Sequence, residues 1–319
     1  MSPVSVPARI PVGLGLPVDD PAGLLTWARL AEESSFSTLG LLDRLVYDNP
    51  DPLVTLAALA GATSRIRVQT EVLLAPHYNT AILAKQTATL DRISGGRFTF
   101  GIGIGGREDD CQVAGIDIRR RGRRLDEQLE QLRWAWSGQP YAEGVGPIGP
   151  LPATPGGPEV LFGGFAPAAL ERVARWGDGF LGAALPPAHM DRMFREVETA
   201  WENHGRAGRP KLVAQASVAI GGPSVIADAR ANLLRYYAFT GRAEYMAEGL
   251  LTTPEAVRGA VDAFAGIGAD EVVLYCWSSD PAQIGRLGEM LFDQEKLLTD
   301  GGSGGQETCA ETAAEDGER

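Results

Sequence analysis

The sequence predicts an α/β fold in which eight parallel strands alternate with helices and close into a (β/α)8 TIM barrel. Short apolar runs of strand length alternate with amphipathic segments of helix length through almost the whole chain. Such an alternation requires a parallel sheet covered by helices, and eight units suffice to close a barrel. No boundary between two domains is visible, so residues 1–299 are predicted to form one domain. A doubly wound open sheet is the alternative, but it rarely contains eight equal units.

The first half of the chain contains four strands, each followed by a helix. The strands are predicted from short runs rich in aliphatic and β-branched residues, at 10–16, 37–43, 66–72 and 97–104. The helices show apolar residues at three- and four-residue steps. The first starts at Asp19-Asp20-Pro21, where a cap precedes an early proline, and the others are 51–63, 80–93 and 123–136.

The second half repeats this rhythm after a Gly/Pro-rich connector. Its predicted strands are 159–164, 178–185, 211–220 and 271–277, and its predicted helices are 167–176, 187–204, 253–268 and 281–298. Residues 221–252 form a long insertion after the seventh strand, since loops in such units are normally much shorter. Residues 300–319 are Gly-rich and then acidic without apolar periodicity, so a disordered tail is predicted.

Composition excludes several classes of partner. The net charge is −12, whereas nucleic-acid-binding proteins present a basic face, so no nucleic-acid partner is expected. No apolar run is long enough to cross a bilayer, and the N-terminus lacks the basic and apolar regions of a signal peptide. A cytoplasmic protein without a membrane contact is therefore expected.

Cysteine and histidine are too scattered to indicate a metal or disulfide framework. The three cysteines are Cys111, Cys276 and Cys309, without a C-x-x-C spacing, and the three histidines form no i, i+4 pair. We expect no metal centre.

The run GIGIGG at 101–106 has the Gly-x-Gly-x-x-Gly spacing of a dinucleotide-binding fingerprint. In a Rossmann unit these glycines open a helix directly, and the next strand follows about twenty residues later. Here a polar, broken segment follows, and the next strand is predicted only at Glu159. The run is instead interpreted as a barrel strand whose last glycines lie at the C-terminal end, where barrel active sites form.

Several motifs resemble those of the luciferase-like flavin/F420-dependent oxidoreductases. The main one is TSRIRVQTEVLLAPHYNTAILAKQTATLDRISGGRFTFGIGIGGRED, and others are ESSFSTLGLLDRL, RRRGRRLDEQLEQLRWAW, GGFAPAALERVARWGDGFL and TPEAVRGAVDAFAGIGADEVVLY. The resemblance covers about residues 10–295. It implies a (β/α)8 barrel, in agreement with the strand count.

The resemblance implies an enzyme with a flavin-type cofactor at the C-terminal mouth of the barrel. The preferred hypothesis is a two-component monooxygenase, in which a separate reductase supplies reduced FMN and O2 oxidises a small apolar or aromatic metabolite. The alternative is hydride transfer with F420, which an F420 reductase would supply in reduced form. A third hypothesis is a flavin-binding protein without catalysis. The Arg119–Arg124 run is interpreted as a solvated helix start, and no clear basic cluster for F420's acidic tail is seen, which favours FMN. Family members are often homodimers.

The resemblance also assigns the residues expected to bind the cofactor. At the end of the third strand, Thr70, Glu71 and Val72 correspond to a bulge under the ring that often contains a non-proline cis peptide, here Glu71–Val72. A carboxylate at Glu71 is unusual and would accept a ring N–H or disfavour an anionic reduced ring; an ion pair with an arginine is the alternative. The further expected cofactor-binding residues are Gly103, Gly105, Arg107, Gly163, Gly164, Phe165, Ala166 and Trp277. The run 163–166 is expected to bind phosphate at a helix N-terminus.

Three residues are the catalytic candidates. Asp43-Arg44 ends the second strand, where many relatives have Asp-His; arginine stays protonated and cannot act as the base. Arg44 is expected to hold an anionic substrate or reduced flavin, or to pair with Asp43 or Glu71. His77 is the candidate acid/base because it is the histidine nearest the expected ring.

The remaining expectations concern the substrate pocket. Leu16, Cys111, Tyr236 and Phe239 are expected to line it, and no base is seen beside Cys111 in the sequence. The insertion at 221–252 is predicted to form a lid or pocket wall, with a pair of dimer-interface helices as the alternative.

Overall fold

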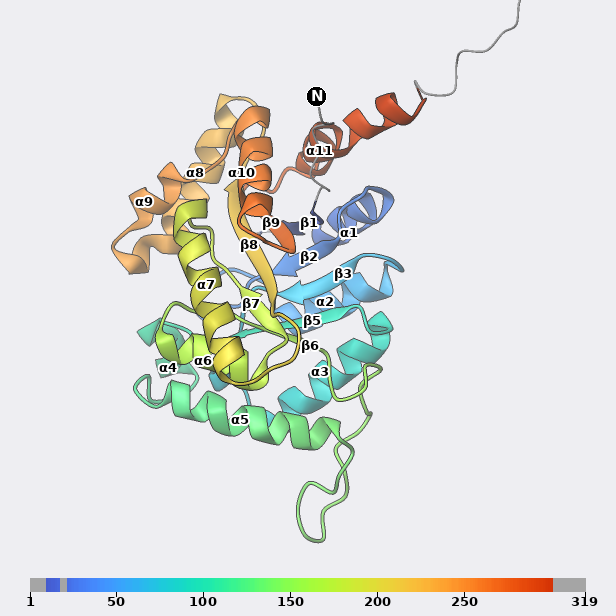
Figure 1. The fold of residues 1–319 in the computed structure, drawn as a ribbon, viewed down its shortest axis with the longest axis vertical. Coiled ribbons are helices and arrows are strands. Elements are labelled where there is room, and N and C mark those ends of the chain that lie inside the picture. The colour runs from blue at the N-terminus through green and yellow to red at the C-terminus, as the bar shows by residue number, and fades with distance from the viewer. Residues whose placement is uncertain (1–9, 18–21, 301–319) are drawn as a thin grey trace, which may run out of the picture.

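The strands close into one parallel barrel surrounded by helices (Figure 1). The structure, a computed structural model, describes residues 10–17 and 22–300. The strands are β1 Val12–Gly15, β2 Thr38–Leu41, β3 Arg67–Thr70, β4 Leu73–Leu74, β5 Phe98–Gly103, β6 Glu159–Phe162, β7 Gly179–Leu181, β8 Lys211–Val218 and β9 Glu271–Cys276. They follow the order β3-β2-β1-β9-β8-β7-β6-β5-β4, and pairing of β3 with β5 closes the ring.

The eight-stranded barrel predicted from the sequence is confirmed, with one strand divided. The predicted third strand, 66–72, is β3 and β4 separated by Glu71 and Val72, so both pieces occupy one position in the barrel. All the pairs are parallel. The predicted tail, apart from Asp300, lies outside the described residues.

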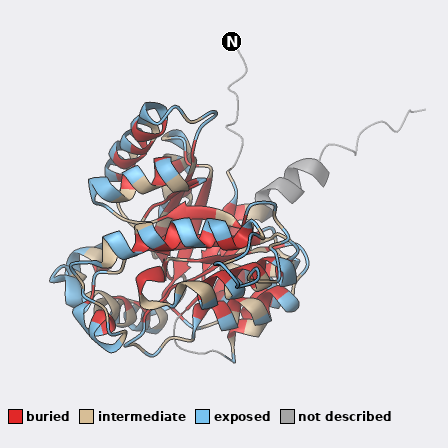
Figure 2. Cartoon of the chain, turned by 90° about the horizontal axis from the view of Figure 1, so that it is seen from below, coloured by how far each residue is buried: buried red, intermediate tan, exposed pale blue. Residues whose placement is uncertain are grey.

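The helices cover the outside of the barrel. Their bounds are α1 Leu24–Glu33, α2 Pro52–Gly61, α3 Thr80–Ser94, α4 Glu108–Val113, α5 Arg121–Trp136, α6 Pro167–Trp176, α7 Pro187–Asn203, α8 Pro223–Tyr237, α9 Ala243–Glu248, α10 Pro254–Gly266 and α11 Ala282–Asp300, with 3₁₀ turns η1 Ala75–His77 and η2 Ala238–Thr240. Asp51, Asn79 and Thr253 cap α2, α3 and α10 through their side chains. Figure 2 shows buried residues on the strands and on the helix faces turned toward them.

The long insertion after the seventh barrel strand is also confirmed, and it is helical. α8, η2 and α9 project beyond the barrel on one side (Figure 1). The short helix α4 was not expected, because the sequence after the glycines of β5 is polar and lacks a helical apolar pattern. Within the described part of the chain, no helix combines the length and apolarity needed to cross a membrane.

The interior of the barrel is layered. Charged side chains fill its N-terminal end: Arg67 and Lys211 contact Glu159 at 3.3 and 3.2 Å, and Lys211 also contacts Glu271 at 3.4 Å. Above this floor lies an apolar layer formed by Leu161, Leu181, Val213 and Val273, with Val72 packed against it. Polar and aromatic side chains occupy the C-terminal end, which is the mouth of the barrel. Apolar and hydrogen-bonded layers of this kind make the barrel a packed core rather than a pore.

Glu159 provides a test of the barrel floor. The charges of Lys211 and Arg67 and hydrogen bonds from Thr99 and Lys211 lower its pKa, outweighing the opposing effect of burial. Its contribution to stability is therefore present above the pKa of the unfolded carboxyl and is lost as pH falls through the folded value. We expect Glu159→Gln to reduce the free energy of unfolding by about 1–3 kcal/mol at pH 7 and by less at pH 4, measured by urea unfolding.

Glu130→Gln is the matched control for this substitution. Glu130 pairs with Arg175 at 3.4 Å, but both side chains are about 60% exposed. Exposed pairs contribute about 0–1 kcal/mol. Equal losses for the two variants would contradict a structural role for the charged floor.

Candidate active site

The mouth of the barrel is shaped by the interruption between β3 and β4. The Glu71–Val72 peptide is cis, as predicted. The Val72 side chain fits between two glycines: a Cβ at Gly103 or Gly163 would lie 2.7 or 2.9 Å from a Val72 methyl group. A Cβ at Gly101 would collide with the Thr70 carbonyl oxygen. These glycines of the GIGIGG run therefore make room for the interrupted strand beside them.

Glu71 lies at the top of the barrel interior. Gln69 Nε2 donates to its Oε1 at 2.7 Å, and Gln215 Nε2 donates to its Oε2 at 2.5 Å. Gly40 faces this carboxylate, and a Cβ there would collide with it. No described arginine forms an ion pair with Glu71, so the arginine partner considered from the sequence is not found. Two neutral amides hold the carboxyl instead.

Burial determines the protonation of Glu71. Burial raises its pKa to about 8, and the negative charge of Glu271 adds to this, while the hydrogen bonds from Gln69 and Gln215 oppose it. The side chain is nevertheless partly accessible, because it faces a cavity at the mouth. Glu71 is therefore a carboxyl that can exchange a proton near neutral pH.

The cavity beside Glu71 is small and mostly aromatic. Its accessible volume is only about 30 Å³. Trp277 Nε1 donates to Ser217 Oγ at 3.0 Å, and Tyr275 Oη accepts from the Leu42 N–H at 3.2 Å. Its lining residues are Leu42, Glu71, Ala184, Gln215, Ser217, Tyr236, Tyr237, Tyr275 and Trp277. The mouth thus combines one carboxyl with several aromatic surfaces.

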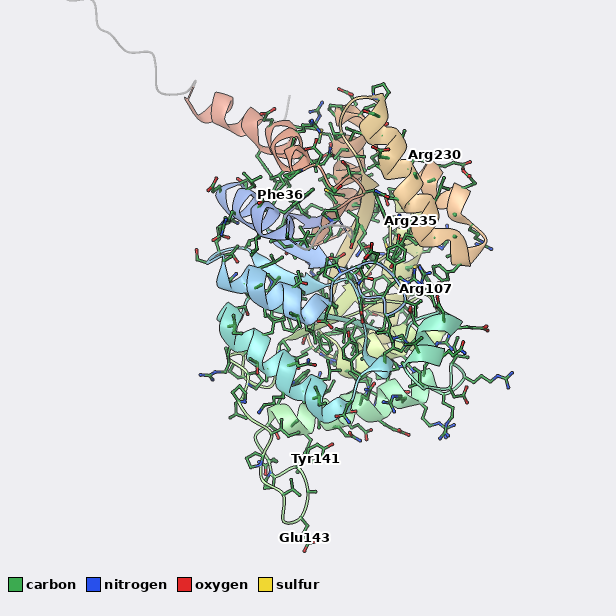
Figure 3. The ribbon with its side chains drawn as sticks, turned by 180° about the vertical axis from the view of Figure 1, so that it is seen from behind. Phe36, Arg107, Tyr141, Glu143, Arg230 and Arg235 are labelled. Atoms are coloured by element: carbon green, nitrogen blue, oxygen red, sulfur yellow. The ribbon has the colours of Figure 1, made fainter. Side chains whose placement is uncertain are left out.

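The insertion, residues 221–252, packs over the mouth. Arg107 donates through Nη2 to the Tyr236 carbonyl oxygen at 2.7 Å, and its guanidinium lies 3.4 Å from the ring centroid of Phe239. Asn232 Nδ2 donates to the Trp277 carbonyl oxygen at 3.1 Å. Figure 3 shows Arg107 between the barrel and α8, which carries Arg235. Tyr236 lines the cavity, whereas Phe239, which was also expected to line it, is half exposed and does not.

Asp43 and Arg44 are both buried, but they have different partners. Asp43 Oδ2 accepts from the Leu74 N–H at 2.8 Å and from Tyr78 Oη at 3.2 Å. Burial raises the Asp43 pKa to about 6. Arg44 contacts Asp109 at 3.4 Å and Asp110 at 3.6 Å, so the expected pairing with Asp43 or Glu71 is not found. The two acidic residues lie on α4, which the sequence pattern did not reveal.

His77 lies beside Cys111, outside the aromatic cavity. Their Nε2 and Sγ atoms are 3.7 Å apart, which corrects the expectation that Cys111 has no base nearby. Burial lowers the His77 pKa and raises the Cys111 pKa, so a neutral pair is favoured. Leu16 is fully buried in the core between strands and helices and does not line the cavity.

The helix α6 begins at the mouth next to β6. Its N-cap residue, Ala166, provides no side-chain hydrogen bond to the first turn. Gly164 has φ = +144°, a conformation that favours glycine, and Phe165 is 61% exposed. An uncapped N-terminus leaves backbone N–H groups that can bind an anion.

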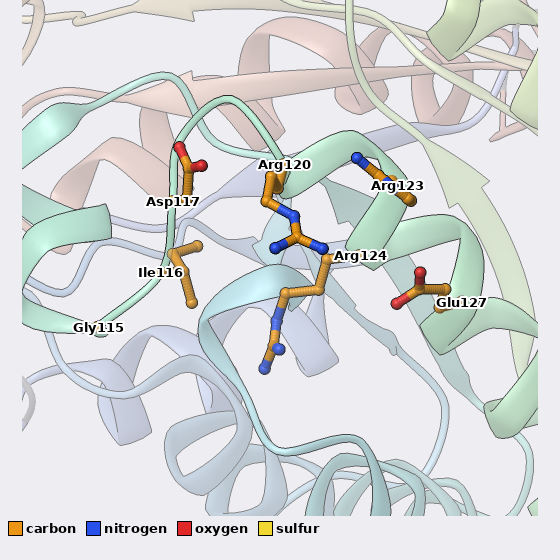
Figure 4. A pocket seen from close by; sticks show the side chains of 7 residues that line it. All are labelled: Gly115, Ile116, Asp117, Arg120, Arg123, Arg124 and Glu127. Atoms are coloured by element: carbon orange, nitrogen blue, oxygen red, sulfur yellow. The ribbon is translucent and has the colours of Figure 1, made fainter.

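A second, more polar groove lies at the start of α5 (Figure 4). Arg120, Arg123 and Arg124 line it together with Gly115, Ile116, Asp117 and Glu127. Arg124 Nε also donates to the Pro76 carbonyl oxygen at 2.7 Å, in the turn that follows β4. The arginine run is therefore more than a solvated helix start, since it connects α5 to a loop of the mouth.

Some residues of the site were missed from the sequence. Gln69 and Gln215 hold Glu71, and Tyr237 and Ser217 line the cavity. A signal for Gln215 was present, because it is a polar residue at an inward position of an otherwise apolar strand. No local pattern marks Tyr237, since its position depends on how the insertion packs.

The fold and this mouth match a known family. Residues 2–274 match the model of the luciferase-like monooxygenase family. The chain belongs to this family and is an enzyme. An uncharacterised protein of Mycobacterium tuberculosis is 30% identical over 207 residues, which are 56% of this chain and 71% of that protein.

Solved structures share the barrel. An F420-dependent secondary alcohol dehydrogenase in complex with an F420–acetone adduct has a TM-score of 0.75 and 16% identity, covering 89% of this chain and 98% of its own. The oxygenating constituent of 3,6-diketocamphane monooxygenase from Pseudomonas putida, a type II Baeyer–Villiger monooxygenase in complex with FMN, has a TM-score of 0.72 and 17% identity, covering 88% and 96%. At these identities the similarity shows the fold.

Gly40 provides a test of the space that Glu71 needs. We expect Gly40→Ala to displace the carboxylate and to reduce the free energy of unfolding by about 1–3 kcal/mol, as overpacking of a core does. Gly61→Ala is the control, because nothing lies within 4 Å of a Cβ there. Thermal unfolding of both variants measures the difference, and unchanged stability of Gly40→Ala would argue against this packing.

The raised pKa of Glu71 predicts a pH dependence. The folded pKa of about 8 exceeds the ordinary value of 4.5, so the folded state holds this proton more tightly than the unfolded state. The stability of the wild-type protein should therefore fall relative to Glu71→Gln as pH rises from about 5 to 8. Urea unfolding at several pH values measures this difference, and parallel stability profiles for the two proteins would refute it.

Proposed function

We propose that this enzyme is the oxygenase component of a two-component monooxygenase that uses reduced FMN and O2 to oxidise a small apolar or aromatic metabolite. The observation that carries the proposal is the mouth itself, where the Glu71 carboxyl and aromatic side chains line one cavity next to the interrupted strand at Val72. Family membership supports this chemistry, and the similar fold of an FMN-bound oxygenating constituent is consistent with it.

The residues at the mouth fit a flavin. Thr70 Oγ1 donates to the Gly101 carbonyl oxygen at 2.6 Å, which fixes the end of β3 below the proposed ring site. Val72, Gly103 and Gly105 would form the backbone-rich floor, with Trp277 at its side. The uncapped turn of Gly163, Gly164, Phe165 and Ala166 would hold the phosphate. The bound reduced flavin supplies the electrons for oxygen activation.

The protein's own groups would control water and protons at this site. Glu71 is the group placed to hold a proton at the cavity, and Asp43, with its pKa of about 6, is the second candidate. His77 stays a candidate acid/base, although it does not line the aromatic cavity and lies between Cys111 and Gly105. The insertion would serve as a lid that excludes water from the site.

The lid role predicts how the cofactor is admitted. The accessible volume of about 30 Å³ is far below that of small-molecule sites, so a three-ring cofactor would require the insertion to move. We expect Phe239→Ala, which removes the ring stacked on Arg107, to speed FMN binding severalfold. Stopped-flow quenching of flavin fluorescence measures the rate, and an unchanged rate would count against a gating role.

A homodimer is also proposed, on the basis of α2. This helix, PLVTLAALAG, carries no charged residue, and an apolar helix is normally buried on all sides. Val54 on α2 and Ile82 on the adjacent α3 are 68% and 58% exposed. We expect a dimer by light scattering, and a monomer for the Val54→Asp, Ile82→Asp double variant; a monomeric wild-type protein would exclude this arrangement.

F420 is the second candidate cofactor, and a specific feature favours it. Arg120, Arg123 and Arg124, interpreted from the sequence as a solvated helix start, line one groove and form a basic cluster there. Such a cluster could bind an acidic tail. With F420, the reaction would be hydride transfer without O2, and the reductase partner would be an F420 reductase.

Cofactor binding and oxidation distinguish these proposals. We would titrate the protein with FMN and with F420 under anaerobic conditions, each in oxidised and reduced form. Tighter binding of reduced FMN, with reoxidation by O2 that differs in rate from that of free FMN, would support the monooxygenase. Binding of F420 with reoxidation of FMN at the free rate would replace it with the hydride-transfer enzyme, and binding without turnover of any substrate would indicate a flavin-binding protein.

A further inference from the structure

Arg107 is a buried cation without a carboxylate partner. The residue is only 8% exposed, and no described carboxylate lies within 4 Å of its guanidinium. Its side-chain hydrogen bonds go to Tyr236, to the carbonyl oxygen and to the phenol group, and both of these partners are neutral, although a guanidinium has five N–H donors. Buried charges in proteins are normally paired, because an unpaired charge loses its hydration without compensation. The site therefore has capacity for an anion.

Arg44 adds a second cation to the same place. It is also 8% exposed, and its Nε lies 3.6 Å from Asp110 Oδ2, an ion pair that is too long to be a hydrogen bond. Asp109 and Asp110 lie 3.4 and 3.6 Å from Arg44, whereas neither carboxylate lies within 4 Å of Arg107. Burial lowers the Arg107 pKa and the charge of Arg44 lowers it further, although Asp110 and Asp109 partly offset this. An anion bound beside Arg107 would relieve the repulsion between the two guanidinium groups.

Aromatic rings surround the two cations. The Arg107 guanidinium lies 3.4 Å from the Phe239 ring centroid and 5.1 Å from that of Tyr236. The Arg44 guanidinium lies 4.7 Å from the ring centroid of Tyr47, which packs edge-on against Tyr236. Tyr236 in turn lines the cavity next to Glu71. Flat apolar surfaces and planar donors together suit a planar ligand with anionic oxygen atoms.

We propose that Arg107 and Arg44 form the anion-binding end of the substrate site, and that the substrate is an aromatic compound carrying a carboxylate or a similar anionic oxygen group. The proposal rests on the proposed function and specifies its substrate class. It assigns Arg107 to the substrate instead of the cofactor. The reason is its direction, because the side chain extends from the end of β5 to the insertion after β8, whereas the proposed phosphate site follows β6.

The first experiment uses the full chain without flavin and needs no variant. Benzoate and its neutral analogue benzamide would be titrated by calorimetry, with inorganic phosphate as a third probe. Charge-assisted hydrogen bonds are about twice as strong as neutral ones, so we expect benzoate to bind at least about tenfold more tightly than benzamide. Equal affinities, or no saturable binding of benzoate, would overturn the proposal. Binding of phosphate as tight as that of benzoate would overturn its aromatic part.

Variants then test which residue is responsible. Arg107→Met should weaken benzoate binding at least about tenfold and leave benzamide unchanged, while Arg107→Lys should lose less because it keeps the charge. Arg206→Met is the matched control, because Arg206 also stacks on an aromatic ring, that of Trp201 at 4.0 Å, and also donates to backbone carbonyl groups. Arg206→Met should retain benzoate binding. Equal losses in both methionine variants would indicate a general structural effect and overturn the assignment.

Measurements of cofactor affinity distinguish this proposal from the proposed function. Affinities for FMN and for riboflavin, which lacks the phosphate, would be measured in wild-type protein and in Arg107→Lys, the variant that keeps the charge and is the safer one for folding. Unchanged FMN affinity with weakened benzoate binding would support a substrate role. A loss confined to FMN, with riboflavin unaffected, would assign Arg107 to the cofactor phosphate and overturn the proposal. Absence of flavin binding in the wild-type protein would reject the proposed function while leaving the benzoate result intact.

Discussion

The packing of Val72 between Gly103 and Gly163 is the constraint on which the mouth of the barrel depends. It allows the third strand to break at Glu71 and resume as β4, paired with β5. The break turns Glu71 inward, above Gly40, where a larger residue would leave it no space. Glycines on β2, on β5 and directly after β6 therefore determine where one carboxyl can be placed.

The rest of the mouth is organised around that carboxyl by residues distant in the chain. Gln215 from β8 reaches Glu71 from the opposite side of the barrel, and Tyr275 from β9 fills the space beside it. The insertion adds Tyr236 above the cavity, attached to β5's loop through Arg107. The carboxyl held by amides, the aromatic walls and the insertion over the mouth come from separate parts of the chain, and all of them meet at one small cavity.

The alternation of strands and helices in the sequence was enough to predict the barrel, because periodicity and strand length are local properties. The resemblance to relatives located Glu71–Val72, and the structure has the cis peptide there. The partners were not predictable in the same way. Arg44 pairs with Asp109 and Asp110 rather than with its neighbour Asp43, and Cys111 meets His77, because these contacts depend on α4, a short helix without an apolar pattern. Leu16 was predicted to end the first strand and to line the pocket, but it lies one residue beyond β1 and packs into the hydrophobic core.

The apolar layer in the middle of the barrel separates two charged compartments. The negative charge of Glu271 acts on Glu71 through this layer, since electric fields cross a low-dielectric medium with little screening. Protons cannot cross in the same way, because Leu161, Leu181, Val213 and Val273 provide no hydrogen-bonding groups to carry them. Glu71 is thus electrically coupled to the floor but chemically isolated from it. Proton exchange is therefore left to the side of the mouth, and in the proposed lid role the opening of the insertion would set when Glu71 gains or loses its proton.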